Sequence, residues 1–278
     1  MIFQKRRKNM KLRDRFWLWG HPEGRYNNYA DNFGFPYESR MTPTEACFFL
    51  GISNTFMTPV GWKVDKRKYN KAFTPLRGVA WDMGVDLVKE PDKVGVADKY
   101  IDDARDFPNV ISAVFDDFKW KDRYKEITLD EFAGIMDRLH NNDVRPINTW
   151  MTLYTHEFGV DKSADEDFQP YIDVFDGIVM WTWKESNVPQ IPEKWEIFKK
   201  MTKKRRMFGC YLWNFGESKP ATREAVLWQL DFYREKILLG EAEGVVLHTN
   251  VMADVDLDSF DAAIEWLKIH GDEEVADI

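Results

Sequence analysis

Eight short apolar runs recur along the chain, and a longer polar or amphipathic segment follows each of them. The runs are continuous rather than alternating, which is typical of parallel strands that are buried on both faces. Because these runs are short and evenly spread, each is expected to form one strand. The expected strands are residues 16–20, 54–60, 78–84, 111–115, 147–155, 177–183, 206–216 and 244–250.

The segments between the runs carry helix signals. The segment 42–52 starts with a Thr cap, has Pro43 early and places Glu45 near its first turn. Pro108 ends another segment, because proline cannot continue a helix. The expected helices are residues 42–52, 92–107, 128–142, 167–176, 192–204, 222–240 and 256–271, with 65–76 helical or mixed.

Eight strand–helix units over about 250 residues match the size and order of a (β/α)8 TIM barrel, so the sequence predicts a single barrel of the α/β class. A doubly wound open sheet is the alternative. That fold would usually have a glycine-rich turn after its first strand, whereas residues 20–28, GHPEGRYNN, contain no GxGxxG. We expect residues 15–278 to form the catalytic barrel and the basic residues 1–14 to form a flexible N-terminal arm.

The totals restrict the partners. A net charge of −8 over 278 residues argues against nucleic acid, and no apolar run approaches the ~18 residues of a membrane span. No apolar stretch of a signal peptide follows the basic residues, so the sequence as written favours the cytoplasm, or the periplasm or secretion if a signal has been removed. Cys47 and Cys210 are predicted to be buried hydrophobes. We expect no metal and no cofactor, and leave the oligomeric state open.

Polar and aromatic residues gather where the expected strands end, which is where barrels of this type place their chemistry. The chain has 12 Trp, whose flat apolar rings can stack on sugar rings. Aromatic walls with acids, amides and imidazoles for hydroxyls predict a carbohydrate substrate, an oligosaccharide or a glycoconjugate. The candidate substrate-binding residues are Trp19, His21, Asp82, Tyr154, His156, Glu157, Thr182, Trp183, Glu185, Tyr211, Trp213, Asn214, His248 and Asn250.

The apolar run 111–115, ISAVF, leads directly into Asp116 and Asp117. Two adjacent carboxylates in apolar surroundings repel each other, so at least one pKa should rise, as a general acid for a glycosidic oxygen requires. Adjacent strand residues point in opposite directions, so the chain must turn here if both carboxylates are to face one sugar. Otherwise Asp117 alone faces the cleft and Asp116 caps a neighbouring element.

Both aspartates are therefore candidate catalytic residues of a glycoside hydrolase. In most glycosidases the second carboxylate lies roughly 5–10 Å from the first, and an adjacent pair is too close for that layout. The pair suits substrate-assisted hydrolysis, in which the 2-acetamido oxygen of the sugar is the nucleophile, as in a retaining β-N-acetylhexosaminidase. The alternative is a glycosidase for a sugar without an acetamido group, with Glu157 or Glu185 as the second carboxylate.

Three short motifs resemble those of glycoside hydrolase family 84, the family of O-GlcNAcases and bacterial β-N-acetylglucosaminidases. The strand that ends in FDD, residues 115–117, resembles the strand-four signature of that family. IVMWTW (178–183) resembles its IMWTG, and CYLWNFG (210–216) resembles its WWNFP, in the same order along the chain. GHPEGRY (20–26) more loosely resembles its EGFYG. Together the motifs cover about a tenth of the chain.

The resemblance implies roles for individual residues. Asp116 would orient the acetamido group, and Asp117 would be the general acid and base. Asn214 would contact the sugar hydroxyls or the acetamido group, Tyr154 would lie beside the reacting carbon, and Thr182 would line the same pocket. The activity implied is retaining hydrolysis of a β-N-acetylglucosaminide.

The chain also departs from this family. Trp183 stands where the family has Gly, which would crowd or reshape the pocket. The family has an Asp beyond WWN that holds sugar hydroxyls; Lys219 stands at the matching spacing here, with Glu217 nearby. Lys63 only loosely matches the family's basic residue after strand two. These differences concern the residues that would contact the sugar and not the barrel or the acid.

Two other classes of function are compatible with the sequence. A metal-dependent hydrolase or isomerase could use His21, His156 and His248, with Asp82 and Asp116 as further ligands. However, the first strand has no HxH pair, and the chain has no HExxH. A catalytically silent sugar-binding barrel would keep the aromatic rim and bind sugar without turnover.

Overall fold

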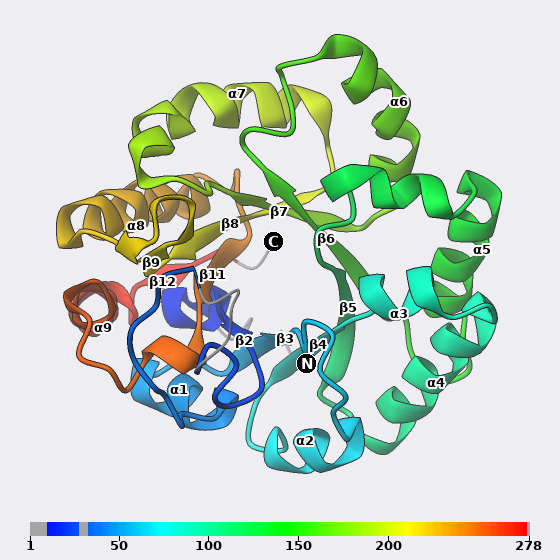
Figure 1. The fold of residues 1–278 in the computed structure, drawn as a ribbon, viewed down its shortest axis with the longest axis horizontal. Coiled ribbons are helices and arrows are strands. Elements are labelled where there is room, and N and C mark those ends of the chain that lie inside the picture. Colours follow the sequence, from blue (N-terminus) through cyan, green and yellow to red (C-terminus); the bar gives the residue numbers. More distant parts are fainter. Residues whose placement is uncertain (1–9, 28–32, 277–278) are drawn as a thin grey trace, which may run out of the picture.

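The computed structural model describes residues 10–27 and 33–276, which form a closed barrel. Eight parallel strands pair in the order β11-β2-β3-β4-β5-β6-β7-β8, and helices surround them (Figure 1). This arrangement confirms the predicted (β/α)8 TIM barrel. The barrel strands are β2 (Phe16–Gly20), β3 (Asn54–Met57), β4 (Gly78–Asp82), β5 (Val110–Phe115), β6 (Asn148–Tyr154), β7 (Gly177–Trp181), β8 (Arg205–Tyr211) and β11 (Gly244–His248).

Helices follow the strands as the sequence predicts, and threonine hydroxyls cap several of them. Thr42, Thr128 and Thr222 each accept the backbone N–H three residues further on. The α-helices are α1 (Pro43–Leu50), α2 (Lys66–Ala72), α3 (Gly84–Lys89), α4 (Lys93–Asp106), α5 (Leu129–His140), α6 (Lys162–Ile172), α7 (Ile191–Met201), α8 (Arg223–Leu238) and α9 (Asp258–His270).

Helix α6 is the element that differs most from its expected bounds. It begins at Lys162 rather than 167, because the Asp161 side chain accepts the N–H groups of Ser163 and Ala164 and starts the helix there. Helix α3 was not expected. Short 3-10 helices also occur, namely η1 (Leu12–Arg15), η2 (Trp120–Glu126), η3 (Glu185–Gln190), η4 (Phe215–Glu217) and η5 (Asn250–Met252).

Several barrel strands end before the apolar run does. Residues 58–60 follow β3 outside the sheet, and residues 212–216 follow β8 in the same way. There Trp213–Asn214 (β9) pairs with Lys219–Pro220 (β10). These extra residues form part of the loops at the C-terminal end of the barrel, which is where the polar strand ends were expected to gather.

The end of the expected N-terminal arm is attached to the barrel. Met10–Lys11 (β1) pairs with Glu274–Val275 (β12), and Arg13 contacts Asp272 at 2.9 Å. Leu12 is completely buried. The arm therefore cannot extend as far as residue 14, because residues 10–14 pack against the C-terminal segment. Residues 1–9 lie outside the described residues.

Two glycines make room for large rings inside the barrel. A Cβ added to Gly209 on β8 would overlap the ring of Trp181, and one added to Gly177 would overlap the ring of Trp150. Both indoles are at most 1% exposed. Glycine on one strand thus allows a tryptophan on its neighbour to fill the interior, and Trp181 becomes part of the floor of the cavity described below.

Cys47 and Cys210 are both buried free thiols, as predicted. Within the described ranges, no helix has both the length and the apolar character needed to cross a membrane.

Candidate active site

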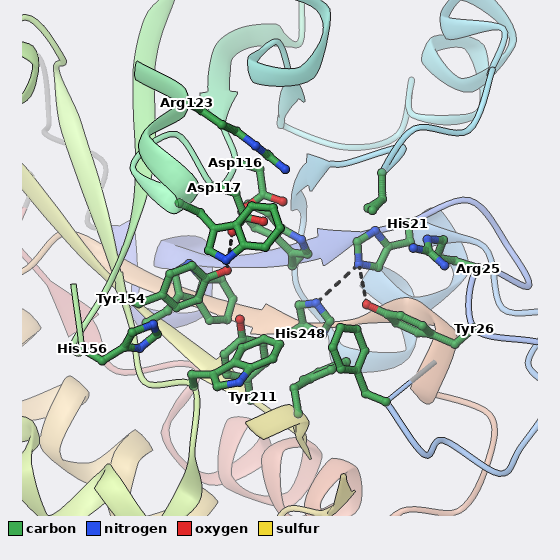
Figure 2. A pocket seen from close by; sticks show the side chains of 17 residues that line it. His21, Arg25, Tyr26, Asp116, Asp117, Arg123, Tyr154, His156, Tyr211 and His248 are labelled. Carbon is green, nitrogen blue, oxygen red and sulfur yellow. Dashed lines mark hydrogen bonds between the residues drawn. The ribbon is translucent and has the colours of Figure 1, made fainter. Parts of the chain in front are cut away.

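A cavity of about 490 Å³ opens at the C-terminal ends of the barrel strands. It brings together both catalytic candidates and seven of the fourteen candidate substrate-binding residues (Figure 2). The predicted residues that line it are Trp19, His21, Asp116, Asp117, Tyr154, His156, Trp183, Tyr211 and His248. Further lining residues that the sequence did not single out are Arg25, Tyr26, Phe33, Val60, Trp120, Arg123, Trp181 and Phe215.

The chain turns between the two aspartates, as it must if both carboxyl groups are to face one sugar. Asp117, the second residue after strand β5, has a φ of +51°, in the left-handed region. This turn breaks the alternation of the strand, so that Asp116 and Asp117 both line the cavity. Aspartate tolerates this backbone region better than most residues. The structure therefore differs from the alternative in which Asp117 alone faces the cavity.

One hydroxyl group bridges the pair. Thr152 on β6 donates its hydroxyl proton to Asp116 Oδ1 at 3.2 Å, and its oxygen accepts the Asp117 backbone N–H at 2.9 Å. The Asp116 N–H in turn lies 3.3 Å from Oδ1 of the buried Asp82. These bonds from β4 and β6 fix the backbone of both catalytic candidates and hold their carboxyl groups at one wall.

Burial and mutual repulsion favour a proton on the pair. Burial raises the pKa of Asp116 well above its usual value, and the charges of Asp117 and Asp82 raise it further. Burial also raises the pKa of Asp117, although a hydrogen bond from Tyr154 and the charge of Arg123 act in the opposite direction. Interacting carboxyls titrate as a unit, so the pair holds a proton at a pH where ordinary aspartates hold none.

Tyr154 connects this wall to the next one. Its hydroxyl donates to Asp117 Oδ1 at 2.9 Å (Figure 2). His156 stacks on the Tyr154 ring with centroids 5.5 Å apart, and burial lowers the pKa of His156. The phenol and the imidazole come from the end of β6 and its loop, as the sequence predicts, and they flank Asp117 on one side.

Two histidines meet at the floor. His21 Nδ1 lies 2.8 Å from the Thr58 carbonyl oxygen, so Nδ1 carries the proton and Nε2 is an acceptor. His21 Nε2 lies 3.4 Å from both the Tyr26 hydroxyl and His248 Nε2. Burial lowers the pKa of His21 to about 4 and that of His248 well below its usual value. Both rings are therefore neutral, and they can exchange hydrogen bonds with a neutral polar ligand.

Aromatic rings form the remaining walls. Trp183 stacks on Phe215 with centroids 5.6 Å apart, and it meets the rings of Tyr154 and Tyr211 edge-on. Trp183 therefore shapes the cavity, which is the consequence expected of a large ring where the resembling family has Gly. Trp181 lines the same cavity, and its indole N–H has no hydrogen-bond partner among the described residues.

Seven predicted site residues do not line this cavity, and six of them make hydrogen bonds that support the surrounding structure. Glu185 accepts from the Thr222 N–H at 2.7 Å and from its hydroxyl at 3.1 Å, which places it at the start of helix α8. Glu157 accepts the Tyr154 N–H at 2.9 Å, and burial raises its pKa to about 7. Neither glutamate is among the residues that line the cavity.

Asn214 and Asn250 hold backbone rather than ligand. Asn214 donates to Glu217 at 2.8 Å and accepts the Glu185 N–H at 3.3 Å. Asn250 accepts the His21 N–H at 2.7 Å and donates to the His21 carbonyl oxygen at 3.0 Å, so it fixes the strand end that carries His21. Asn214 therefore supports the loop after β8 and does not line the cavity in which the resemblance would place it.

The other three lie behind the wall or outside it. Trp213 donates its indole N–H to the Phe33 carbonyl oxygen at 3.1 Å, which holds the loop that carries the Phe33 ring. Thr182 is 6% exposed and does not line the cavity. Asp82 is 5% exposed and supports Asp116 from behind.

The ligand set of the metal-enzyme alternative is not assembled. His21 and His248 meet, but His156 stacks on Tyr154 on another wall. Among the residues that the structure describes, no three His, Cys, Asp or Glu side chains lie close enough to hold a metal ion together.

The residues that sequence analysis missed come mostly from loops. Trp120 and Arg123 lie on η2, beyond the strand end, and Arg25, Tyr26 and Phe33 lie in the long connection after β2. Their signal was the aromatic and basic content of these connections. These residues lie too far along their loops to be located from the ends of the strands.

The comparisons with known proteins agree on the fold. No protein-family model matches the chain, and no curated protein sequence matches it either. A chain of tryptophan synthase from M. tuberculosis has a TM-score of 0.52 at 13% identity, with 94% of each chain covered. A chitinase from Chromobacterium violaceum has a TM-score of 0.51 at 9% identity, covering 89% of this chain and 98% of that one. Such identities establish the barrel and no particular reaction.

Proposed function

We propose that this protein is a glycoside hydrolase that acts on a β-linked 2-acetamido sugar with retention of configuration. The observation that carries the proposal is the turn at Asp117, which presents two adjacent, hydrogen-bonded carboxyl groups to one cavity. The aromatic walls suit the apolar faces of a sugar ring, and the motifs around Asp117, Trp183 and Asn214 resemble glycoside hydrolase family 84. The chitinase among the structural neighbours is compatible with this proposal but does not carry it.

The two carboxyl groups would divide the work when the sugar binds. The acetamido N–H donates to Asp116, and this hydrogen bond favours the ionised form of Asp116. The shared proton then resides on Asp117, where it is available to the glycosidic oxygen. Asp117 thus becomes the general acid although burial in the free protein favours a proton on Asp116.

The first step breaks the glycosidic bond. The acetamido oxygen attacks the anomeric carbon, Asp117 gives its proton to the departing oxygen, and the ionised Asp116 stabilises the positive charge of the resulting oxazolinium ring. In the second step Asp117 takes a proton from water as that water attacks the anomeric carbon, and the N-acetyl group is restored. Two inversions give net retention, and Tyr154 holds Asp117 in position throughout.

The test is hydrolysis of matched aryl glycosides. We expect the wild-type protein to cleave 4-nitrophenyl β-N-acetylglucosaminide and not the β-glucoside, and Asp117→Asn to lower kcat by at least about a hundredfold. Asp122→Asn is the matched control, because Asp122 is exposed on η2 and pairs with Lys125 at 3.2 Å. Equal cleavage of the β-glucoside would exclude substrate assistance, and near-normal activity of Asp117→Asn would exclude Asp117 as the acid.

A further inference from the structure

A second cavity of about 280 Å³ adjoins the first. Val60, in the loop after β3, lines both cavities, so the two share a wall. The second cavity also contains Asp82, whose Oδ1 accepts the N–H of Asp116 at 3.3 Å. It therefore lies beside the acidic wall of the first cavity.

The second cavity carries an excess of positive charge. Three lysines line it, Lys63, Lys66 and Lys89, together with the carboxyl groups of Asp82 and Asp86. Lys66 and Asp86 form an ion pair at 3.1 Å and so offset each other. Lys63 and Lys89 form no ion pair with any residue that the structure describes. Two uncompensated ammonium groups remain, in a chain whose net charge is −8.

Asp82 does little to offset these lysines. It is 5% exposed, and its Oδ1 already accepts the N–H groups of Gly84 at 2.9 Å and of Asp116 at 3.3 Å. Burial raises its pKa to about 7, so the carboxyl is partly neutral near physiological pH. A concave wall with a local excess of one charge sign attracts ligands of the other sign.

The place of the second cavity relative to Asp116 and Asp117 indicates which part of a substrate it would contact. Figure 2 shows Asp116 and Arg123 on one side of the first cavity and Tyr211 on the other. A general acid must reach the glycosidic oxygen, so the departing group lies at the wall that Asp117 forms with Asp116, and Asp82 of the second cavity accepts the N–H of Asp116 at this wall. Arg123 lines the first cavity and adds a cation to this wall, stacked over the half-exposed ring of Trp120 at 4.8 Å.

We propose that the second cavity is a subsite for an acidic group on the leaving-group side of the glycosidic bond, either the carboxylate of a uronic acid or a sulfate ester. Lys63 and Lys89 are the residues that recognise this group, and Arg123 favours its approach. The proposal rests on the proposed function, because it takes the aspartate pair as the point of cleavage. It narrows the substrate class to an N-acetylhexosaminide that is attached to an acidic glycan.

The kinetic test compares three disaccharides, in which β-N-acetylglucosamine is linked to glucose, to glucuronic acid or to 6-sulfated glucose. We expect kcat/KM to be higher for at least one acidic disaccharide than for the neutral one, and this advantage to shrink as NaCl is added. Which acidic disaccharide is preferred distinguishes carboxylate from sulfate. Replacing both Lys63 and Lys89 by Gln should lower the ratio of kcat/KM for the acidic disaccharide to kcat/KM for the neutral one. The expected decrease is ~5- to 25-fold, because two exposed ion pairs with the substrate are lost.

Lys200→Gln is the matched control, because Lys200 is exposed on helix α7 and lines neither cavity. It should leave the acidic-to-neutral ratio unchanged. A ratio that stays within about twofold in the double lysine variant, or an acidic advantage that does not respond to salt, would overturn the subsite.

A binding measurement separates this inference from the proposed function. If none of the disaccharides is hydrolysed, the proposed function fails, and calorimetric titration with methyl β-glucuronide, glucose 6-sulfate and methyl β-glucoside still tests the cavity. Binding of an acidic probe in preference to the neutral one, lost in the double lysine variant, supports an anion site without glycosidase activity. Equal binding of all three probes by the wild-type protein would overturn the subsite as well.

Discussion

The hydroxyl of Tyr154 donates a hydrogen bond to Asp117 Oδ1 at 2.9 Å. Asp117 lies after strand β5 and Tyr154 ends strand β6, so two adjacent barrel strands meet at this bond. The bond orients the carboxyl and also favours its ionised form, which opposes the effect of burial on the pKa of Asp117. Tyr154 therefore affects both the position and the titration of the proposed acid.

Replacement of Tyr154 by Phe removes this hydrogen bond and keeps the ring. The pKa of Asp117 should rise, since its ionised form loses a donor, and the alkaline limb of the kcat/KM–pH profile should move to higher pH. Loss of orientation should lower kcat by about 10- to 100-fold. Tyr171→Phe is the control, because its hydroxyl donates to the Ile127 carbonyl oxygen at 2.9 Å and does not face the cavity. An unshifted alkaline limb would contradict the titration role.

Gly209→Ala should destabilise the protein. The new Cβ would overlap the Trp181 ring inside the barrel, and overpacking of a core typically costs about 1–3 kcal/mol. Gly134→Ala on the exposed face of helix α5 meets no atom within 4 Å and should instead stabilise by ~0.5–1 kcal/mol through helix propensity. Chemical denaturation of both variants measures the two effects. If both variants changed the free energy of unfolding by the same amount and in the same direction, the Trp181 ring would not be what requires glycine at position 209.

The order of strands and helices was predictable because parallel strands leave continuous apolar runs. Strand β2 matches its expected range, residues 16–20, and the other barrel strands were located with errors mainly at their ends. The strand ends were extended too far where apolar residues continue into a loop, as in the segment 212–216. The pairing of Met10–Lys11 with Glu274–Val275 was missed, because two-residue strands leave no periodic pattern.

The site was predictable to the extent that strand ends converge. Asp117, Tyr154 and His248 lie at strand ends and line the cavity as expected. Asn214 and Glu185 also follow strands, but they are used in hydrogen bonds between loops, which spacing along the chain does not reveal. The second cavity was not predicted either, because its lysines are brought together only by the loop after β3 and helices α2 and α3.

Asp82→Asn should gain stability relative to the wild type as the pH rises. The pKa of Asp82 is about 7 in the folded protein and near 4 in the unfolded chain, so the folded protein holds the proton more tightly. The free energy of unfolding of the wild type therefore falls as the pH rises from about 4 to about 7. The amide has no such cost and keeps an oxygen for the two backbone N–H groups. The free energy of unfolding of the variant minus that of the wild type should therefore be larger at pH 8 than at pH 5, by at least ~1 kcal/mol. The exposed Asp102→Asn is the control and should show no comparable gain.

The two aspartates should differ in how their loss depends on the leaving group. In the proposed mechanism Asp117 supplies a proton that a good leaving group does not need. Asp117→Asn should therefore cost little with 2,4-dinitrophenyl N-acetylglucosaminide and at least about a hundredfold with a sugar leaving group. In the same proposed mechanism Asp116 stabilises the oxazolinium ring, which would form whatever group departs, so Asp116→Asn should cost a similar factor across the series. The measurement is a plot of log kcat/KM against leaving-group pKa for both variants. A steeper slope for Asp116→Asn than for Asp117→Asn would mean that the two residues exchange roles, in line with the stronger effect of burial on the pKa of Asp116.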